Sequence, residues 1–410
     1  MNDTLPAARD HLVAAAHDHL VAAAHDHLVE AARDLVPALR AGAPAAERGH
    51  RLTPGDARFL HEAGFFALHA PAALGGLGAS IATAVDVHAE LARGSGSAAW
   101  CAVILSGAGL LASRFPAAGR EELWADDPRA GVCGSFFPTG TGRRVPGGLR
   151  VSGRWQPMSG VHHARWALLP VLVQDVQDER PAVEAVLVPV EALDVEPTWD
   201  VVGMAGTGSD TAVAQDVLVP QRRCAPFGAL LGAGAPDADD PLRSTTAYSA
   251  VGVCAGAVLV GMARAGLELV LDALGEGRPL ASSTYADARD APGVRFDVAS
   301  AARLVDTAGL HLARATGEVE RGAREGRQLD VATRARVRAD LATITVSTRA
   351  ALGHLLDAGG ARSFAAGNPL QAVWRDVEVL SRHPLLAPGL NVDVYARTLL
   401  GSQEQVAAFV

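Results

Sequence analysis

The feature that most constrains the fold of this chain is the order in which its hydrophobic periods change. Residues 29–130 repeat their apolar positions with a helical period, and residues 131–222 carry short β-rich runs separated by turn signals. From about residue 240 the helical period returns. The alternating strand–helix units of a doubly wound nucleotide-binding fold are missing. The sequence therefore predicts an α+β protein, in which a central β-sandwich or β-barrel separates an N-terminal helical domain from a C-terminal helical bundle.

This order predicts four segments: a helical extension over 1–28, an N-terminal helical domain over 29–130, a central β domain over 131–222 and a helical bundle over 223–410. A chain of 410 residues exceeds the size at which a single core stops growing. Thr53 is expected to cap a helix that begins at Pro54. Further helices are expected at about 81–93, 97–115, 341–357 and 370–382.

Composition indicates a soluble protein of a reducing compartment. Apolar residues make up 49% of the chain and charged residues 20%, and the net charge of −9 without a basic run argues against nucleic acid as a partner. The four cysteines lie far apart, which argues against a disulfide framework or a thiolate zinc site and favours the cytoplasm. The apolar stretch 247–263 is borderline for a membrane span, but its glycine and alanine content favours a buried helix.

The N-terminus contains an internal repeat of eight residues, with Asp10–His17 recurring as Asp18–His25. An eight-residue period drifts by about 80° per repeat around an α-helix, so the histidines do not gather on one face. We therefore expect a solvent-facing extension of the first helix and no metal site.

Several short segments resemble functional motifs but lack the neighbouring residues or elements that those motifs require. The glycine-rich segments Gly75–Gly78 and Gly206–Ser209 do not stand between a strand and a helix, so neither is a dinucleotide-binding fingerprint. His61-Glu62 lacks the second histidine of a zinc-protease motif, and no GxSxG sequence is present. We expect no NAD(P)H site in this chain.

Two segments carry candidate chemistry. In 151–160 a strand period places Trp155 and Ser159 on one face and Met158 on the other. This arrangement is compatible with a functional site, and equally with a tryptophan of the hydrophobic core next to a serine in a turn. In 368–384, Asp376 and His383 are seven residues apart and are expected to share a helix face that ends before Pro384. A histidine at a helix C-terminus is expected to favour its protonated form, in an active site or simply in solvent.

These segments belong to a collinear series of motifs. The series comprises 60–66, 71–78, 96–100, 151–160, Trp199, 206–209, 216–220, 368–371, 374–376, His383 and 395–401. Over some 370 residues it resembles the acyl-CoA dehydrogenase-like flavin monooxygenases, the class that includes the oxygenase components of two-component aromatic hydroxylases.

The resemblance implies a reduced flavin, FMN or FAD, bound between the β domain and the bundle, with O2 as co-substrate and a C4a-hydroperoxide as the oxygenating species. It places Ser159 at flavin N5 and His383 near the flavin ring as the catalytic residues. It also implies Trp155, Met158, Thr207 and Ser209 as flavin-lining residues, and Trp100 and Ala108 as substrate-binding residues. Arg375 and Asp376 are expected to hold the bundle and a neighbouring subunit together.

The resemblance further implies a separate NAD(P)H-dependent flavin reductase, a small-molecule substrate and a homotetramer, with no membrane or nucleic-acid partner. Aromatic hydroxylases of the class commonly carry a histidine about eight residues after the Ala-Ala-Trp segment, where this chain has Ala108. The substrate is therefore left open among aromatic or polyketide compounds and amines, the last implying an amino-sugar N-hydroxylase.

Two different functions are also compatible with the sequence. An acyl-CoA dehydrogenase would need a carboxylate base, for which Glu378 is the available candidate. The fold could also serve as a scaffold without turnover.

Overall fold

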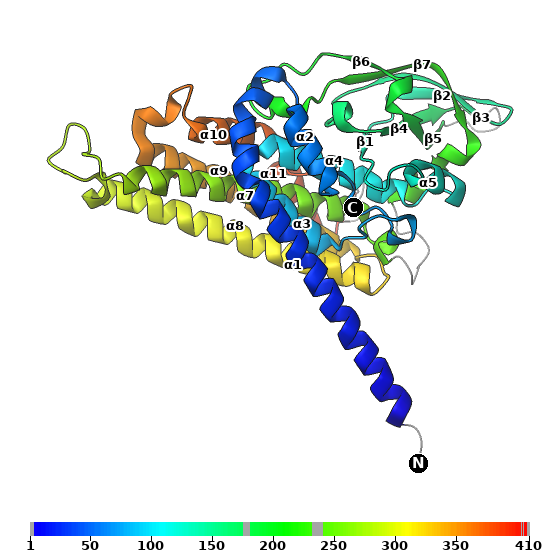
Figure 1. The fold of residues 1–410 in the computed structure, drawn as a ribbon, viewed down its shortest axis with the longest axis horizontal. Coiled ribbons are helices and arrows are strands. Elements are labelled where there is room, and N and C mark those ends of the chain that lie inside the picture. The colour runs from blue at the N-terminus through cyan, green and yellow to red at the C-terminus, as the bar shows by residue number, and fades with distance from the viewer. Residues whose placement is uncertain (1–3, 175–180, 232–240, 403, 405, 408–410) are drawn as a thin grey trace.

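The computed structural model describes residues 4–174, 181–231, 241–402, 404 and 406–407. Figure 1 shows the strands gathered on one side of the molecule, next to a layer of long helices. The first part of α1 (Thr4–Gly49) extends away from both. The predicted order of helices, strands and helices is confirmed.

The N-terminal region consists of helices. After α1 come α2 (Pro54–Glu62), α3 (Ile81–Gly94), α4 (Gly96–Ala112) and α5 (Ala117–Trp124). The predicted cap is confirmed, because Thr53 Oγ1 accepts a hydrogen bond from the Asp56 amide at 3.1 Å and Pro54 is the first helical residue. The proposed boundary at residue 28 lies inside α1, which continues through it without interruption.

The central strands form one mixed sheet. They are β1 (Val132–Gly134), β2 (Gly140–Val145), β3 (Gly148–Trp155), β4 (Trp166–Val173), β5 (Ala182–Pro189), β6 (Asp194–Glu196), β7 (Thr211–Pro220) and β8 (Cys224–Pro226). Seven of them follow the order β6-β7-β3-β2-β4-β5-β8, and β1 pairs with β4. The β1–β4 and β2–β4 pairs are parallel and the other described pairs are antiparallel.

The C-terminal region is a bundle around α7. Its helices are α6 (Phe227–Leu231), α7 (Ala247–Gly275), α8 (Pro292–Arg324), α9 (Val331–Gly359), α10 (Pro369–Leu380) and α11 (Pro388–Leu399). Within the described residues α7 is the one helix long and apolar enough to cross a membrane, but 89% of its most apolar window is buried inside the fold. This matches the expectation of a core helix.

Small residues let α7 approach its neighbours closely. A Cβ atom at Gly261 would lie 2.2 Å from the carbonyl oxygen of Ala89 on α3, so only glycine fits there. α7 also packs against α4, α8, α9 and α10. It therefore joins the N-terminal helices to the bundle and brings α4 next to the segment that follows α10.

Candidate active site

A small apolar cavity lies where the three regions meet. It has a volume of about 160 Å³ and is lined from α4, from the end of β1 and the loop after it, from the turn after β3, from β4 and α7, and from the segment after α10. Its lining residues are Ile104, Gly107, Ala108, Leu111, Gly134, Ser135, Phe136, Phe137, Pro157, Ser159, Leu168, Val251, His383 and Pro384. Ser159 and His383, far apart in the sequence, thus line one cavity.

Ser159 reaches the cavity from a turn and not from a strand. β3 ends at Trp155, and residues 156–160 leave the sheet, so the predicted strand alternation of Trp155, Met158 and Ser159 is wrong. Backbone bonds fix the turn: the Met158 amide donates to Asp210 O at 3.1 Å and the Gly160 amide to Thr207 O at 2.9 Å. The turn is held by the loop that precedes β7.

Ser159 is one member of a chain of buried hydroxyl groups. The indole Nε1 of Trp100 donates to Ser159 Oγ at 3.2 Å, and Ser159 Oγ lies 2.7 Å from Ser209 Oγ. Ser209 Oγ lies 2.7 Å from Thr207 Oγ1, which donates to the carbonyl oxygen of Met204 at 2.7 Å. Thr207 and Ser209 do not line the cavity, so they support Ser159 from behind.

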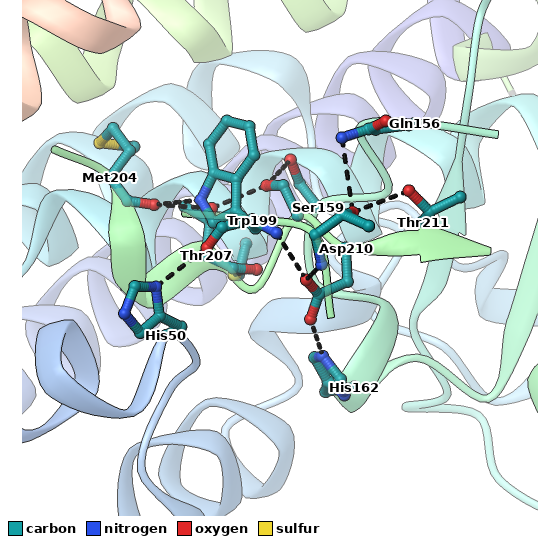
Figure 2. Close-up of polar contacts among 12 residues, drawn as sticks. His50, Gln156, Ser159, His162, Trp199, Met204, Thr207, Asp210 and Thr211 are labelled. Atoms are coloured by element: carbon teal, nitrogen blue, oxygen red, sulfur yellow. Dashed lines mark hydrogen bonds and ion pairs between the residues drawn. The ribbon is translucent and has the colours of Figure 1, made fainter. Parts of the chain in front are cut away.

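The loop that carries these hydroxyl groups is itself tightly bonded, as Figure 2 shows. Asp210 accepts hydrogen bonds from the amides of Thr198 and Trp199 at 2.8 and 2.9 Å, and pairs with His162 Nε2 at 2.7 Å. The Trp199 indole donates to Met204 O at 3.0 Å. Hydrogen bonds from both sides therefore fix the Met204 carbonyl that ends the hydroxyl chain.

His383 lies beyond α10, which ends at Leu380, so the predicted helix face shared with Asp376 is wrong. The prediction of a protonated imidazole is also wrong, because burial lowers the pKa of His383 to about 4. Desolvation of the ring outweighs the field of the helix terminus. The Leu385 amide donates to Nδ1 at 3.3 Å, and an accepting nitrogen in a neutral imidazole carries no hydrogen. The hydrogen of His383 therefore lies on Nε2.

Trp100 connects the two candidate catalytic residues. Its ring packs edge-to-face on the His383 ring with centroids 4.9 Å apart, while its Nε1 bonds Ser159. Ala108, two turns further along α4, lines the cavity with a single methyl group. His383 is thus the one titratable side chain among the described residues that line the cavity.

Other predicted site residues lie elsewhere. Trp155 and Met158 are fully buried in the core and do not line the cavity, and Trp155 Nε1 donates to Pro170 O at 3.0 Å. Ser135, in contrast, lines the cavity although it was not predicted as a site residue. It follows a three-residue strand with no motif around it, so no sequence signal distinguishes it.

Arg375 and Asp376 connect α10 to other parts of the same chain. Asp376 accepts a hydrogen bond from the Met204 amide, and Arg375 pairs with Glu47 on α1 at 2.6 Å and with Val202 O. Burial raises the pKa of Asp376 to about 6. These contacts tie the bundle to the loop behind Ser159; the expected role towards a neighbouring subunit stays a prediction.

Comparison with known proteins places this architecture in a family. The family model described as "Acyl-CoA dehydrogenase, N-terminal domain" matches residues 22–124, and "Acyl-CoA dehydrogenase, C-terminal domain" matches residues 253–388. The oxygenase component of the FADH(2)-dependent resorcinol hydroxylase of Rhizobium sp. (strain MTP-10005) is 30% identical over 84% of this chain and 87% of its own. The flavin-dependent monooxygenase oxygenase subunit HsaA of Rhodococcus jostii is also 30% identical, over 83% and 90%.

Solved structures agree with these relatives. XiaF from Streptomyces sp., solved in complex with FADH2 and glycerol, superposes with a TM-score of 0.90 at 31% identity over 95% of this chain and 99% of its own. The 3-HSA hydroxylase from Rhodococcus sp. RHA1 superposes with a TM-score of 0.83 at 27% identity over 94% and 100%. The chain therefore belongs to the acyl-CoA dehydrogenase superfamily and, within it, to the oxygenase components of two-component flavin-dependent monooxygenases, which use reduced flavin and O2.

Proposed function

We propose that this oxygenase hydroxylates a small aromatic substrate that carries a ring hydroxyl group. The observation that carries the proposal is the convergence of Ser159 and His383 on one ring-sized apolar cavity. A cavity of about 150 Å³ is known to accept benzene, so about 160 Å³ suits a single six-membered ring. The similarity to a resorcinol hydroxylase points to the same substrate class.

The residues around Ser159 suit a reduced flavin. The polar edge of a flavin needs a hydrogen-bonding partner, and Ser159 offers a hydroxyl group at the cavity wall that Trp100 and Ser209 hold in place by hydrogen bonds. We propose that Ser159 contacts flavin N5 and that Thr207 and Ser209 position Ser159. When bound, the reduced flavin supplies two electrons to O2 for oxygen insertion. The protein positions the reactants and excludes water from the cavity.

We propose that His383 binds the oxygen of the substrate's ring hydroxyl group. Its Nε2 carries the hydrogen and it is neutral at pH 7, because its pKa lies at about 4. A hydrogen bond from Nε2–H to the substrate oxygen stabilises negative charge there, which makes the ring a better nucleophile. Ala108 leaves room for the ring and offers no second imidazole.

A dehydrogenase is disfavoured because the candidate carboxylate base is engaged elsewhere. Glu378 does not line the cavity, and it pairs with Arg349 at 3.1 Å and Arg382 at 2.7 Å. Burial alone would raise the pKa of Glu378, but the two arginines hold it below its usual value. A carboxylate so neutralised is a poor base.

Partners and location follow the same family. We propose that a separate NAD(P)H-dependent reductase supplies the reduced flavin, as the name "oxygenase component" implies for the relatives. We also propose a homotetramer, as the family resemblance implies; apolar side chains exposed on α8 and α11, including Leu310 at 73% and Leu399 at 67%, offer surface for contacts between subunits. The four cysteines are all free, which suits the cytoplasm.

The test is product formation with an unrelated flavin reductase, NADH and FAD. A panel of phenol, resorcinol, aniline and an acyl-CoA is incubated with the enzyme in air, and hydroxylated product and H2O2 are both quantified. The proposal expects O2-dependent hydroxylation of at least one phenol, with the balance shifting to H2O2 in Ser159→Ala. Reduction of bound FAD by the acyl-CoA, or turnover of the amine in place of the phenols, would contradict it.

A further inference from the structure

The chain of hydroxyl groups behind the cavity has a fixed hydrogen-bond direction. At one end, Trp100 Nε1–H can only donate, and it faces Ser159 Oγ at 3.2 Å. At the other end, the Met204 carbonyl can only accept, and it takes the hydrogen of Thr207 Oγ1 at 2.7 Å. Each hydroxyl group between these ends has one hydrogen to give.

Counting hydrogens then assigns every bond. Thr207 donates its one hydroxyl hydrogen to Met204 O. At the 2.7 Å contact between Thr207 Oγ1 and Ser209 Oγ, Ser209 must therefore be the donor. Ser209 has no hydrogen left, so at the next 2.7 Å contact Ser159 must donate to Ser209. Ser159 therefore accepts from Trp100 and donates to Ser209, and its remaining capacity towards the cavity is one acceptor lone pair.

The Met204 carbonyl is held in a fixed position at the end of the hydroxyl chain. It also accepts hydrogen bonds from the Thr207 amide at 3.2 Å and the Trp199 indole at 3.0 Å. Thr207 and Ser209 are each only 1% exposed, so water does not compete for their hydrogens. Reversing the chain would remove the hydrogen between Thr207 Oγ1 and Met204 O and leave two acceptor oxygens facing each other at 2.7 Å.

We propose that this fixed hydrogen-bond direction makes Ser159 favour reduced over oxidised flavin, and that Thr207 and Ser209 are the residues that set this preference. N5 of a reduced flavin bears a hydrogen, in both its neutral and its anionic form, and donates it to the Ser159 lone pair. N5 of an oxidised flavin is an acceptor and meets another acceptor. The site thus favours reduced flavin on arrival and disfavours the oxidised form after turnover. This inference rests on the proposed contact between Ser159 and N5.

The difference between a hydrogen bond and two facing acceptors predicts a preference of about tenfold for the reduced form. Removing a link of the chain removes the preference. In Ser209→Ala the hydrogen of Ser159 is free to turn to N5, so oxidised flavin binds about tenfold more tightly while the affinity for reduced flavin changes less than about threefold. Thr207→Val acts in the same direction one step further away, because Ser209 is then free to donate to Ser159.

The experiment measures dissociation constants of oxidised FAD in air and of dithionite-reduced FAD without oxygen, by titration of the full-length chain. Spectroelectrochemistry gives an independent readout, because a tenfold change in the ratio shifts the two-electron potential of bound FAD by about 30 mV. Thr207→Ser, which keeps the hydroxyl group, is the matched control. Thr211→Val removes a buried hydroxyl group that bonds Thr198 and does not belong to the hydroxyl chain. This variant should keep the wild-type ratio of the two dissociation constants.

Each outcome decides a different point. Loss of the preference in Thr207→Val and Ser209→Ala, with the ratio retained in both controls, supports the proposal. A wild-type ratio in folded Thr207→Val and Ser209→Ala overturns the proposal while leaving flavin binding intact. Absence of FAD binding in either oxidation state by the wild type would instead overturn the proposed function itself. If Thr207→Val does not fold, Ser209→Ala decides alone.

Discussion

At the scale of single residues, desolvation decides the chemistry of the site. The position of His383 after α10 suggests a cation, but enclosure lowers the pKa of the ring to about 4. Ser159 likewise differs from an isolated serine, because its one hydrogen is committed to Ser209. In both cases the partner atoms, and not the residue type, determine whether the group donates or accepts.

This leads to a prediction for His383. His383→Ala should lower the rate of product formation about 10- to 100-fold and divert oxygen to H2O2, because the substrate oxygen loses its donor. His383→Gln, which offers an amide N–H instead, should recover part of the product. The measurement is the ratio of product to H2O2 at saturating reduced flavin.

The pH dependence of this ratio provides a separate check. Because the pKa of His383 is lowered from 6.5 to about 4, the ring stays neutral at every pH above about 5. The coupling of wild-type enzyme should therefore be flat between pH 6 and 8. A titration near pH 6.5 that disappears in His383→Gln would contradict the assignment of a neutral imidazole.

At the scale of elements, α10 controls the loop that carries the hydroxyl chain. Asp376 accepts from the Met204 amide and Arg375 pairs with Val202 O, so two residues of one helix hold both sides of Gly203. The Gly203 backbone approaches α10 so closely that a Cβ atom there would lie 2.3 Å from the Arg375 carbonyl oxygen. The loop before β7 and α10 must therefore pack as one unit.

Gly203→Ala should separate α10 from this loop. We expect a loss of stability of about 1–3 kcal/mol, since the added methyl group meets backbone and not a flexible side chain. Binding of reduced FAD should weaken with it, because Met204 orients Thr207. The measurements are chemical denaturation and FAD titration.

A matched glycine provides the control. Gly353 lies on the exposed side of α9 with nothing within 4 Å of its added Cβ, so Gly353→Ala should be neutral or stabilise by up to about 1 kcal/mol. Equal stability changes in the two variants would show that the close approach at Gly203 is unimportant.

At the scale of the whole molecule, several histidines must lose hydration when the chain folds. The pKa of His88 is lowered to about 3 and those of His163 and His383 to about 4, and the pKa of His69 is lowered as well, in each case mainly by burial. Asp376 acts in the opposite sense, because its pKa is raised to about 6. Four histidines with lowered pKa values outnumber this one aspartate, so the net effect of acid should be to destabilise the folded protein.

The sign follows from proton linkage. Between about pH 4 and 6.5, His88, His163 and His383 bind protons in the unfolded chain but not in the folded one, so the free energy of unfolding rises with pH. Stability should fall as pH drops from 6.5, by up to about 1.4 kcal/mol per pH unit for each histidine. Urea denaturation across this range measures the slope. His88→Leu should reduce this slope by about one proton.

The exposed apolar residues of the bundle lead to a prediction about assembly. Four copies of a 42.2 kDa chain should elute together in light scattering coupled to gel filtration. Leu310→Lys on α8, where the side chain is 73% exposed, should dissociate the assembly without unfolding the chain. A monomeric wild type would contradict the proposed homotetramer.

The sequence by itself determined the order of elements and the family. Apolar spacing depends on local backbone geometry, so it reports helices and strands such as α3 and β4 directly. The collinear motifs also identified Ser159 and His383, which do line one cavity. A local pattern cannot, however, show that β3 stops at Trp155 or that α10 stops short of His383, because contacts with other elements set those ends.

Only the tertiary structure decided the protonation of His383 and the direction of the chain from Trp100 to Met204. Desolvation and hydrogen-bond direction depend on atoms brought together from α4, from the turn after β3, from the loop before β7 and from the segment after α10. Their sequence separations carry no information about these distances. Ser159 and His383 were therefore readable from the sequence as residues that line one cavity, whereas the protonation of His383 and the hydrogen-bond direction at Ser159 followed from packing.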